Sequence, residues 1–151
     1  MLEKRIPPVA LVLIVGLLMW LIAEAGPRVE FGDTLRLAVA TALFLLGALF
    51  ALAGVLAFRS SKTTVDPRKP ESSSALVNSG VYRFSRNPMY VGFGLWLLAW
   101  GAFLASAWAL IGVIVFVLYM NRFQIAPEER ALRELFGEEF REYERRVRRW
   151  L

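Results

Sequence analysis

The sequence contains neither cysteine nor histidine. These absences exclude disulfide bonds, thiolate nucleophiles, Cys/His metal sites and a histidine general base. Chemistry must therefore come from carboxylates, arginine, lysine, tyrosine, asparagine, serine or the backbone. No metal site is expected.

Charged residues are also unevenly distributed along the chain. They separate long blocks that carry almost no charge. The hydrophobic fraction is 57%, above the roughly 45–50% of soluble domains. A net charge of +5 fits basic residues that lie at an anionic membrane leaflet. No DNA- or RNA-binding motif accompanies this charge, so no nucleic-acid partner is expected.

The uncharged blocks have the length of membrane helices, since one crossing takes about 20 mostly apolar residues. The last block is too long for one crossing, and we expect it to turn near Ala105-Ser106-Ala107. The sequence therefore predicts an all-α integral membrane protein with a single domain, residues 1–151, and about four transmembrane helices. Their approximate ranges are 7–24, 35–58, 88–105 and 107–123.

The first apolar block has an alternative interpretation. Lys4 and Arg5 before it, and Ala23-Glu24-Ala25 after it, form the pattern of a signal peptide with its cleavage site. The block is longer than most signal sequences, which favours a helix that stays in the membrane.

Lysine and arginine set the expected orientation, because cytoplasmic loops carry an excess of both. The loop 59–87 and the tail after residue 127 are rich in them, whereas the turn at 105–107 has none. We therefore predict that both termini, the loop and the active site face the cytoplasm. Apolar residues recur at helical spacing in the tail, which predicts an amphipathic helix over residues 127–149, with Gly137 as a candidate kink or break. Its other face pairs charges four residues apart, for example Glu129 with Arg133 and Glu144 with Arg148.

Two polar clusters lie where the predicted hairpin enters and leaves the membrane. One is Ser85-Arg86-Asn87-Pro88-Met89-Tyr90, and the other is Pro127-Glu128-Glu129-Arg130. The hairpin returns the chain to the same leaflet, so the clusters can be neighbours. Each also fits an ordinary helix start, with asparagine as N-cap, proline in the first turn and acids at the positive end of the dipole.

A longer pattern resembles the isoprenylcysteine carboxyl methyltransferase family, which is similar to the phospholipid methyltransferases. The resemblance covers roughly residues 62–151 and includes Phe136-Gly137-Glu138-Glu139-Phe140 in the tail. That family usually has Arg-His-Pro where this chain has Arg86-Asn87-Pro88. Asparagine cannot titrate, so an acid–base role at this position is not supported. The matching residues are Leu76, Val77, Gly80, Tyr82, Ser85, Arg86, Asn87, Pro88, Tyr90, Glu128 and Glu129.

The resemblance implies methyl transfer from S-adenosylmethionine to a lipid-like acceptor that enters from the bilayer. An isoprenylcysteine-type carboxylate and a phospholipid amine both remain open as the acceptor. The transfer is an in-line displacement, so alignment alone can supply about 7–11 kcal/mol of the barrier. Neither the acceptor nor the oligomeric state can be read from the sequence.

Roles follow from the resemblance as hypotheses. Glu128 and Glu129 would bind the amino group or ribose of the cofactor, and Arg86 would bind its carboxylate or neutralise Glu128. Aromatic faces attract cations, so Tyr82 and Tyr90 would contact the adenosine or the sulfonium.

Other residues complete the expected site. Gly80 would allow close backbone approach, while Leu76 and Val77 would line the adenine pocket. Asn87 and Pro88 complete the cofactor-binding set, and Asn121 and Arg122 are weaker candidates for orienting the acceptor. Catalytic roles are therefore expected for Arg86, Asn87, Tyr90, Asn121 and Arg122.

Trp96 and Trp100 fit plain helix packing, which we favour, or the wall of a lipid-access groove. Two other function classes are open. A membrane reductase on a related scaffold would use a nicotinamide cofactor, but no dinucleotide-binding fingerprint follows a strand. A non-enzymatic scaffold or transport subunit would place facing polar residues inside the bilayer. The predicted helices have almost none.

Overall fold

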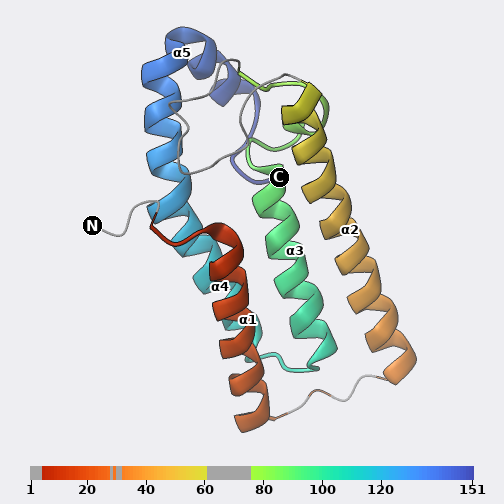
Figure 1. Ribbon diagram of the computed structural model, residues 1–151. Coiled ribbons are helices and arrows are strands. Elements are labelled where there is room, and N and C mark those ends of the chain that lie inside the picture. The colour runs from red at the N-terminus through yellow and green to blue at the C-terminus, as the bar shows by residue number, and fades with distance from the viewer. Residues whose placement is uncertain (1–4, 28, 30–31, 61–75) are drawn as a thin grey trace.

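The computed structural model describes residues 5–27, 29, 32–60 and 76–151, and these residues form helices and connections without a strand. In Figure 1 the long helices run side by side, and the last of them continues into a helix that bends over one end. The helices are α1 (Pro8–Ala25), α2 (Asp33–Ser60), α3 (Pro88–Phe103), α4 (Leu110–Tyr119) and α5 (Ala126–Arg146), with a 3-10 turn, η2 (Gly80–Arg83), and a π-helical segment, η3 (Met120–Ile125). Most of the predicted loop 59–87 lies at 61–75, outside the described residues.

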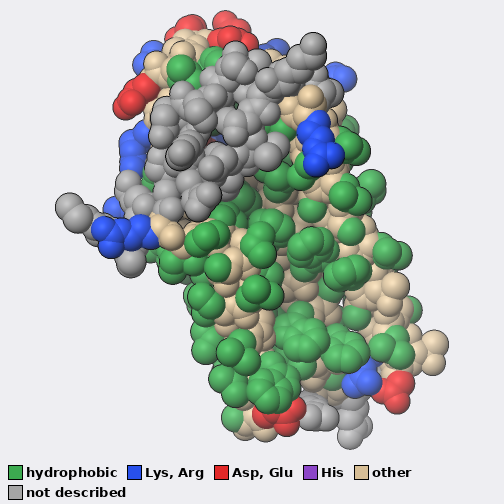
Figure 2. All heavy atoms as spheres, in the orientation of Figure 1, with side chains coloured by type: hydrophobic (Ala, Val, Ile, Leu, Met, Phe, Trp, Pro, Cys, Tyr) green, Lys and Arg blue, Asp and Glu red, His purple; other side chains and the backbone are tan. Residues whose placement is uncertain are grey.

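Three helices, Pro8–Ala25, Asp33–Arg59 and Leu110–Arg146, are long and apolar enough to cross a membrane. The space-filling view in Figure 2 shows an apolar band between two ends that carry the charges. α3 has only 16 residues, or about 24 Å, which is less than the roughly 30 Å of a hydrocarbon core. The exact number of crossings therefore stays a prediction.

Two connections meet at the end of the bundle that lies away from α5 (Figure 1). The chain turns between α3 and α4, near the predicted position, and Ala105 has a positive φ of 50° there. The Val29 amide donates to the Ala105 carbonyl at 2.7 Å, which ties the α1–α2 connection to this turn.

The core lies between α1, α3 and α4, and contact at glycines brings α2 against α3. Leu11, Val15 and Met19 recur every four residues on α1 and pack against Leu97 and Phe116. A Cβ atom at Gly92 would lie 2.6 Å from the carbonyl oxygen of Gly47. The two backbones can therefore approach this closely only where both residues lack a side chain.

The structure differs from the sequence expectation where α4 leaves the apolar band. A break was expected between residues 123 and 127, but the helix continues through the π-helical segment η3 into α5. Pro127 has no backbone N–H and cannot complete the normal helical ladder. A π-helical turn accommodates such a local irregularity without ending the helix.

The tail does not form one continuous helix over 127–149, because Gly137 divides it, one of the expected alternatives. Gly137 has φ 54° and ψ −121°, so the second half of α5 turns back, and the helix ends at Arg146. Glu144 consequently pairs with Arg133, at 2.8 Å, whereas Arg148 lies beyond the helix end. The predicted pair of Glu129 with Arg133 is present at 3.7 Å.

Candidate active site

The two predicted clusters meet at the end of the bundle that carries α5 and the C-terminus (Figure 1). Asn87 precedes α3 and Pro88 occupies its first turn, but the Asn87 side chain does not cap the helix. Its amide group instead donates to the carbonyl of Arg149 at 2.9 Å. Ser85 is fully buried, and its hydroxyl oxygen accepts a hydrogen bond from the Asn87 backbone at 3.1 Å.

Arg86 is the central cation of the cluster. Its guanidinium donates to an Oε1 oxygen of Glu129 at 2.7 Å and to the carbonyls of Glu144 and Val147 at 3.1 and 2.7 Å. The side chain is only 12% exposed, and its Nε atom is buried without a hydrogen-bond partner. Arg86 therefore neutralises Glu129 in this structure, whereas the sequence hypothesis named Glu128.

Glu129 is the most buried carboxylate of the cluster, with 5% of its side chain exposed. Besides Arg86, it accepts hydrogen bonds from Nε of Arg149, at 3.0 Å, and from a terminal nitrogen of the same guanidinium. Two guanidinium groups thus share one carboxylate, which compensates for the desolvation of all three charges.

Glu128 faces a different set of partners from its neighbour in the sequence. The Tyr90 hydroxyl donates to its Oε1 atom at 2.7 Å, and the Gln124 amide donates to the same atom. Tyr90 comes from the first turn of α3 and Gln124 from η3. The two predicted clusters therefore come into direct contact through Glu128 as well as through Glu129.

Tyr82 lies in η2, beside this cluster, in a second apolar group. It is buried with Val77, Phe140 and Tyr143, and Leu76 packs against them. Burial raises the pKa of the Tyr82 hydroxyl above its usual value, and the neighbouring Tyr143 and Glu128 raise it further. Tyr82 is therefore a neutral phenol at ordinary pH and cannot act as a general base.

Gly80 begins η2 with a positive φ of 59°, a conformation that glycine adopts without strain. Among the described residues, leaving out its own neighbours in the chain, no atom lies within 4 Å of the position that a Cβ would occupy there. The close approach of a ligand to this backbone stays a prediction.

Asn121 and Arg122 both belong to η3, but their side chains have different surroundings. The Asn121 side-chain oxygen accepts a hydrogen bond from the Trp150 indole at 3.0 Å, which places it next to the C-terminus. Arg122 is exposed, with its guanidinium carbon 5.6 Å from the centre of the Phe123 ring. Trp150 thus links Asn121 to the C-terminal residues that contact the charged cluster.

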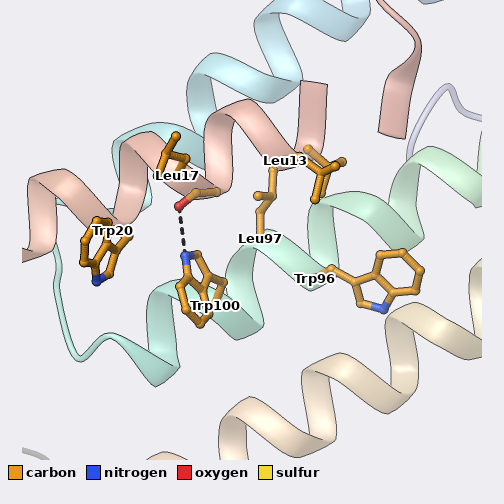
Figure 3. A pocket seen from close by; sticks show the side chains of 8 residues that line it. Leu13, Leu17, Trp20, Trp96, Leu97 and Trp100 are labelled. Carbon is orange, nitrogen blue, oxygen red and sulfur yellow. Dashed lines mark hydrogen bonds between the residues drawn. The ribbon is translucent and has the colours of Figure 1, made fainter. Parts of the chain in front are cut away.

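An apolar groove of about 460 Å³ lies between α1 and α3, within the apolar band. Figure 3 shows Trp20, Leu13 and Leu17 from α1 facing Trp96 and Trp100 from α3. The indole N–H groups of both α3 tryptophans are already bonded, to the carbonyls of Phe44 and Gly16 at 3.1 and 3.0 Å. The rings therefore present apolar surface to the groove, as one of the two sequence interpretations required.

Aromatic rings on α3 connect this groove to the charged cluster. The ring centres of Tyr90 and Phe93 are 6.3 Å apart, and those of Phe93 and Trp96 are 5.6 Å apart. Tyr90 donates to Glu128, and Trp96 lines the groove. A row of packed aromatic rings thus joins the polar site to the apolar groove.

Sequence reasoning missed several residues of this cluster. Gln124 could have been found from its i,i+4 spacing to Glu128, whereas Glu144, Arg149 and Trp150 reach the site only because α5 folds back at Gly137. Among the described residues, no group of three or more acidic side chains could hold a metal ion.

The phospholipid methyltransferase family model matches residues 35–139. An uncharacterized protein of Haemophilus influenzae is 51% identical over 63 residues, which are 42% of this chain and all of the relative. No solved structure matched the chain.

Two named relatives are larger proteins. The protein-S-isoprenylcysteine O-methyltransferase of Mus musculus is 33% identical over 131 residues, or 85% of this chain and 40% of the relative. The Saccharomyces cerevisiae protein of the same name is 37% identical over 82 residues, or 52% of this chain and 33% of the relative. The chain spans less than half the length of these two relatives. Because the family model covers most of its length, including α2 to α4 and both polar clusters, the chain belongs to the phospholipid methyltransferase family.

Proposed function

We propose that this protein is a membrane methyltransferase that uses S-adenosylmethionine to methylate a lipid-like acceptor at the cytoplasmic face. The observation that carries the proposal is the row of packed aromatic rings on α3 that joins the Glu128 and Arg86 cluster to the apolar groove. One end suits a charged cofactor and the other suits a hydrocarbon chain. Family membership supports the same reaction.

The residues of the cluster fit the chemical groups of S-adenosylmethionine. Glu128 would accept hydrogen bonds from its ammonium or ribose hydroxyls, because a carboxylate makes strong bonds to such donors. Arg86 has a buried Nε donor without a partner, which a ligand carboxylate could satisfy. The cofactor, when bound, would supply a methyl group on a sulfonium that already carries its leaving group.

The protein's own contribution is then alignment. Tyr90 would hold Glu128, Arg86 would hold Glu129, and the apolar groove would fix the acceptor chain, so that the reacting oxygen or nitrogen meets the methyl group in line. The helix between Tyr90 and Trp100 is about 15 Å long. The proposal therefore requires a similar distance between the reacting group of the acceptor and the middle of its hydrocarbon chain.

The acid–base inventory favours a carboxylate as the acceptor. A carboxylate attacks without losing a proton, whereas an ammonium group must lose one first. The chain has no histidine, Tyr82 is a neutral phenol, and the Oε1 atom of Glu128 already accepts two hydrogen bonds. An isoprenylcysteine-type carboxylate therefore fits the site better than a phospholipid amine.

The first experiment is calorimetric titration of the detergent-purified protein with S-adenosylmethionine and, separately, with a reduced nicotinamide cofactor. Glu128→Gln keeps an oxygen that accepts from Tyr90 and Gln124, so the variant should fold. It should weaken S-adenosylmethionine binding by about tenfold or more, because a bond to a charged group is lost. Glu139→Gln, on the exposed part of the same helix, is the matched control. Equal affinity in both folded variants would remove Glu128 from the site, and binding of the nicotinamide alone would favour a reductase.

A second experiment tests the groove. Gly16 lines it, and no atom lies within 4 Å of the position that a Cβ would take there. Gly16→Leu should fill the groove without straining α1 and raise KM for N-acetyl-S-farnesylcysteine while leaving cofactor affinity unchanged. Leu21→Phe adds volume on an exposed face of the same helix and is the control. An unchanged KM in Gly16→Leu would mean that the acceptor chain binds elsewhere.

A further inference from the structure

The last five residues, 147–151, form an extended C-terminal segment that runs along the start of α3. α5 ends at Arg146, and Val147 has extended backbone angles. Three successive carbonyls of the segment then accept hydrogen bonds from Ser85, Arg86 and Asn87. The shortest of these joins the Arg86 guanidinium to the Val147 carbonyl at 2.7 Å.

Side chains of the C-terminal segment also make hydrogen bonds to the candidate active site. Arg149 binds both oxygens of Glu129, and Trp150 donates to Asn121. Arg148, between the segment's bonded residues, has an exposed side chain, and Leu151 is 59% exposed. Polar contacts to the candidate active site therefore hold the segment, together with Val147 and Trp150, which pack against the two apolar groups.

Arg149 controls where Glu129 and Arg86 lie. A planar guanidinium that binds both oxygens of a carboxylate fixes the plane of that carboxylate, which a lysine cannot do. With Glu129 fixed in this way, its Oε1 atom meets Arg86 at 2.7 Å. The Arg149 side chain is 37% exposed and Glu129 only 5%, so Arg149 is the more accessible partner.

We propose that Arg149 is a positioning residue of the cofactor site, which acts through Glu129 on Arg86, and that Trp150 anchors the segment that carries it. This inference rests on the proposed use of S-adenosylmethionine. Without Arg149, Glu129 keeps its contact with Arg86 but loses the two bonds that fix its orientation. Arg86 then keeps its bonds to the Glu144 and Val147 carbonyls but faces a carboxylate whose orientation varies.

The test compares Arg149→Ala, Arg149→Lys and Trp150→Phe with the control Arg148→Ala. All four are purified as full-length chains, and their thermal stability and S-adenosylmethionine affinity are measured well below the lowest melting temperature. Arg149→Ala should weaken binding by about tenfold, the effect of losing charge-assisted bonds. Trp150→Phe, which loses one indole N–H but keeps the ring, should weaken it by about threefold. Arg148→Ala should stay within about twofold of the wild type, because exposed charges contribute little.

Arg149→Lys separates positioning from simple support of the fold. Lysine keeps a cation beside Glu129, so it should restore thermal stability while affinity stays low. The positioning role would be overturned if Arg149→Lys recovered stability and affinity equally. It would also be overturned if Arg149→Ala bound S-adenosylmethionine as tightly as Arg148→Ala does. Either result would leave the proposed function standing. Absence of S-adenosylmethionine binding by the folded wild-type protein would overturn both.

Discussion

Asn87 shows how one residue type can be replaced when its task is to donate a hydrogen bond. Its amide donates to the Arg149 carbonyl at 2.9 Å, and its backbone N–H is bonded to Ser85. Neither contact requires a group that titrates. The histidine expected from the family pattern is therefore dispensable for holding the C-terminal segment.

The Asn87→Asp variant tests this donor role. The substitution keeps the shape of the side chain but places a carboxylate oxygen against the Arg149 carbonyl, so two acceptors face each other. We expect the free energy of unfolding to fall by about 1–3 kcal/mol, measured as a lower melting temperature in detergent. Asn78→Asp makes the same change at an exposed position and should have little effect. Equal stability of the two variants would contradict the donor role.

Glu129 presents a second residue-scale question, because a buried carboxylate can support a fold as well as bind a ligand. Glu129→Gln would leave the guanidinium of Arg86, 12% exposed, without its closest anion. Glu144 lies 3.7 Å from the same nitrogen and compensates in part. We therefore expect a loss of about 2 kcal/mol, below the value for a fully isolated buried pair.

The measurement is chemical unfolding of Glu129→Gln beside Glu128→Gln in the same detergent. Glu128→Gln retains an acceptor for Tyr90 and Gln124, so it should unfold nearly as the wild type does. A Glu129 variant as stable as the Glu128 variant would show that the Arg86 pair contributes little to folding.

At the scale of elements, the contact of α2 with α3 depends on the absence of side chains at its centre. A Cβ atom on Gly92 would lie 2.6 Å from the Gly47 carbonyl and 3.1 Å from the Ala51 Cβ. Because backbone atoms form one side of this contact, relief requires the helices to move apart. This contact also positions Phe58, which lies near the end of α2. The Phe58 ring packs edge-on against the Tyr82 ring, with ring centres 5.4 Å apart.

Gly92→Ala should therefore lower the free energy of unfolding by about 1–3 kcal/mol, the range for overpacking. Gly94→Ala is the matched control, since its Cβ would lie 4.0 Å from the nearest atom, in Phe116. The control should be neutral or slightly stabilising, because alanine favours helices more than glycine does. Unfolding in mixed micelles measures both. Equal changes in the free energy of unfolding for the two variants would mean that α2 and α3 can move apart without loss of stability.

At this scale, some elements of the structure can be predicted from the sequence and others cannot. Helix positions follow from uncharged runs, and the meeting of Arg86 and Tyr90 with the two glutamates follows from a hairpin that returns to one side. The π-helical segment before Pro127 has no distinct hydrophobic pattern, because α and π turns bury similar faces. The return of Arg149 to Glu129 depends on one backbone conformation at Gly137, and a charge pattern four residues apart gave no sign of it.

At the scale of the whole molecule, polar function gathers at one end of an apolar bundle. The candidate active site and the C-terminus share that end, while the α1–α2 and α3–α4 connections share the other (Figure 1). Lysine and arginine are more numerous at the first end, so the positive-inside tendency predicts that the site faces the cytoplasm. The four-crossing topology then requires the start of α2 to lie outside.

Single cysteines can test this orientation directly, because the natural chain has none. Asp33→Cys lies at the start of α2, where the side chain is 83% exposed, and Ser79→Cys lies in an exposed position before η2. A membrane-impermeant maleimide added to intact cells should label Asp33→Cys and should reach Ser79→Cys only after the membrane is opened. The unsubstituted chain, which cannot react, is the control for background. Labelling of Ser79→Cys alone would invert the topology, and labelling of both in intact cells would mean that α2, the helix between the two positions, does not cross the membrane. Either result would place Ser79, and with it the candidate site beside η2, away from the cytoplasmic leaflet, so the orientation and the proposed chemistry depend on the same geometry.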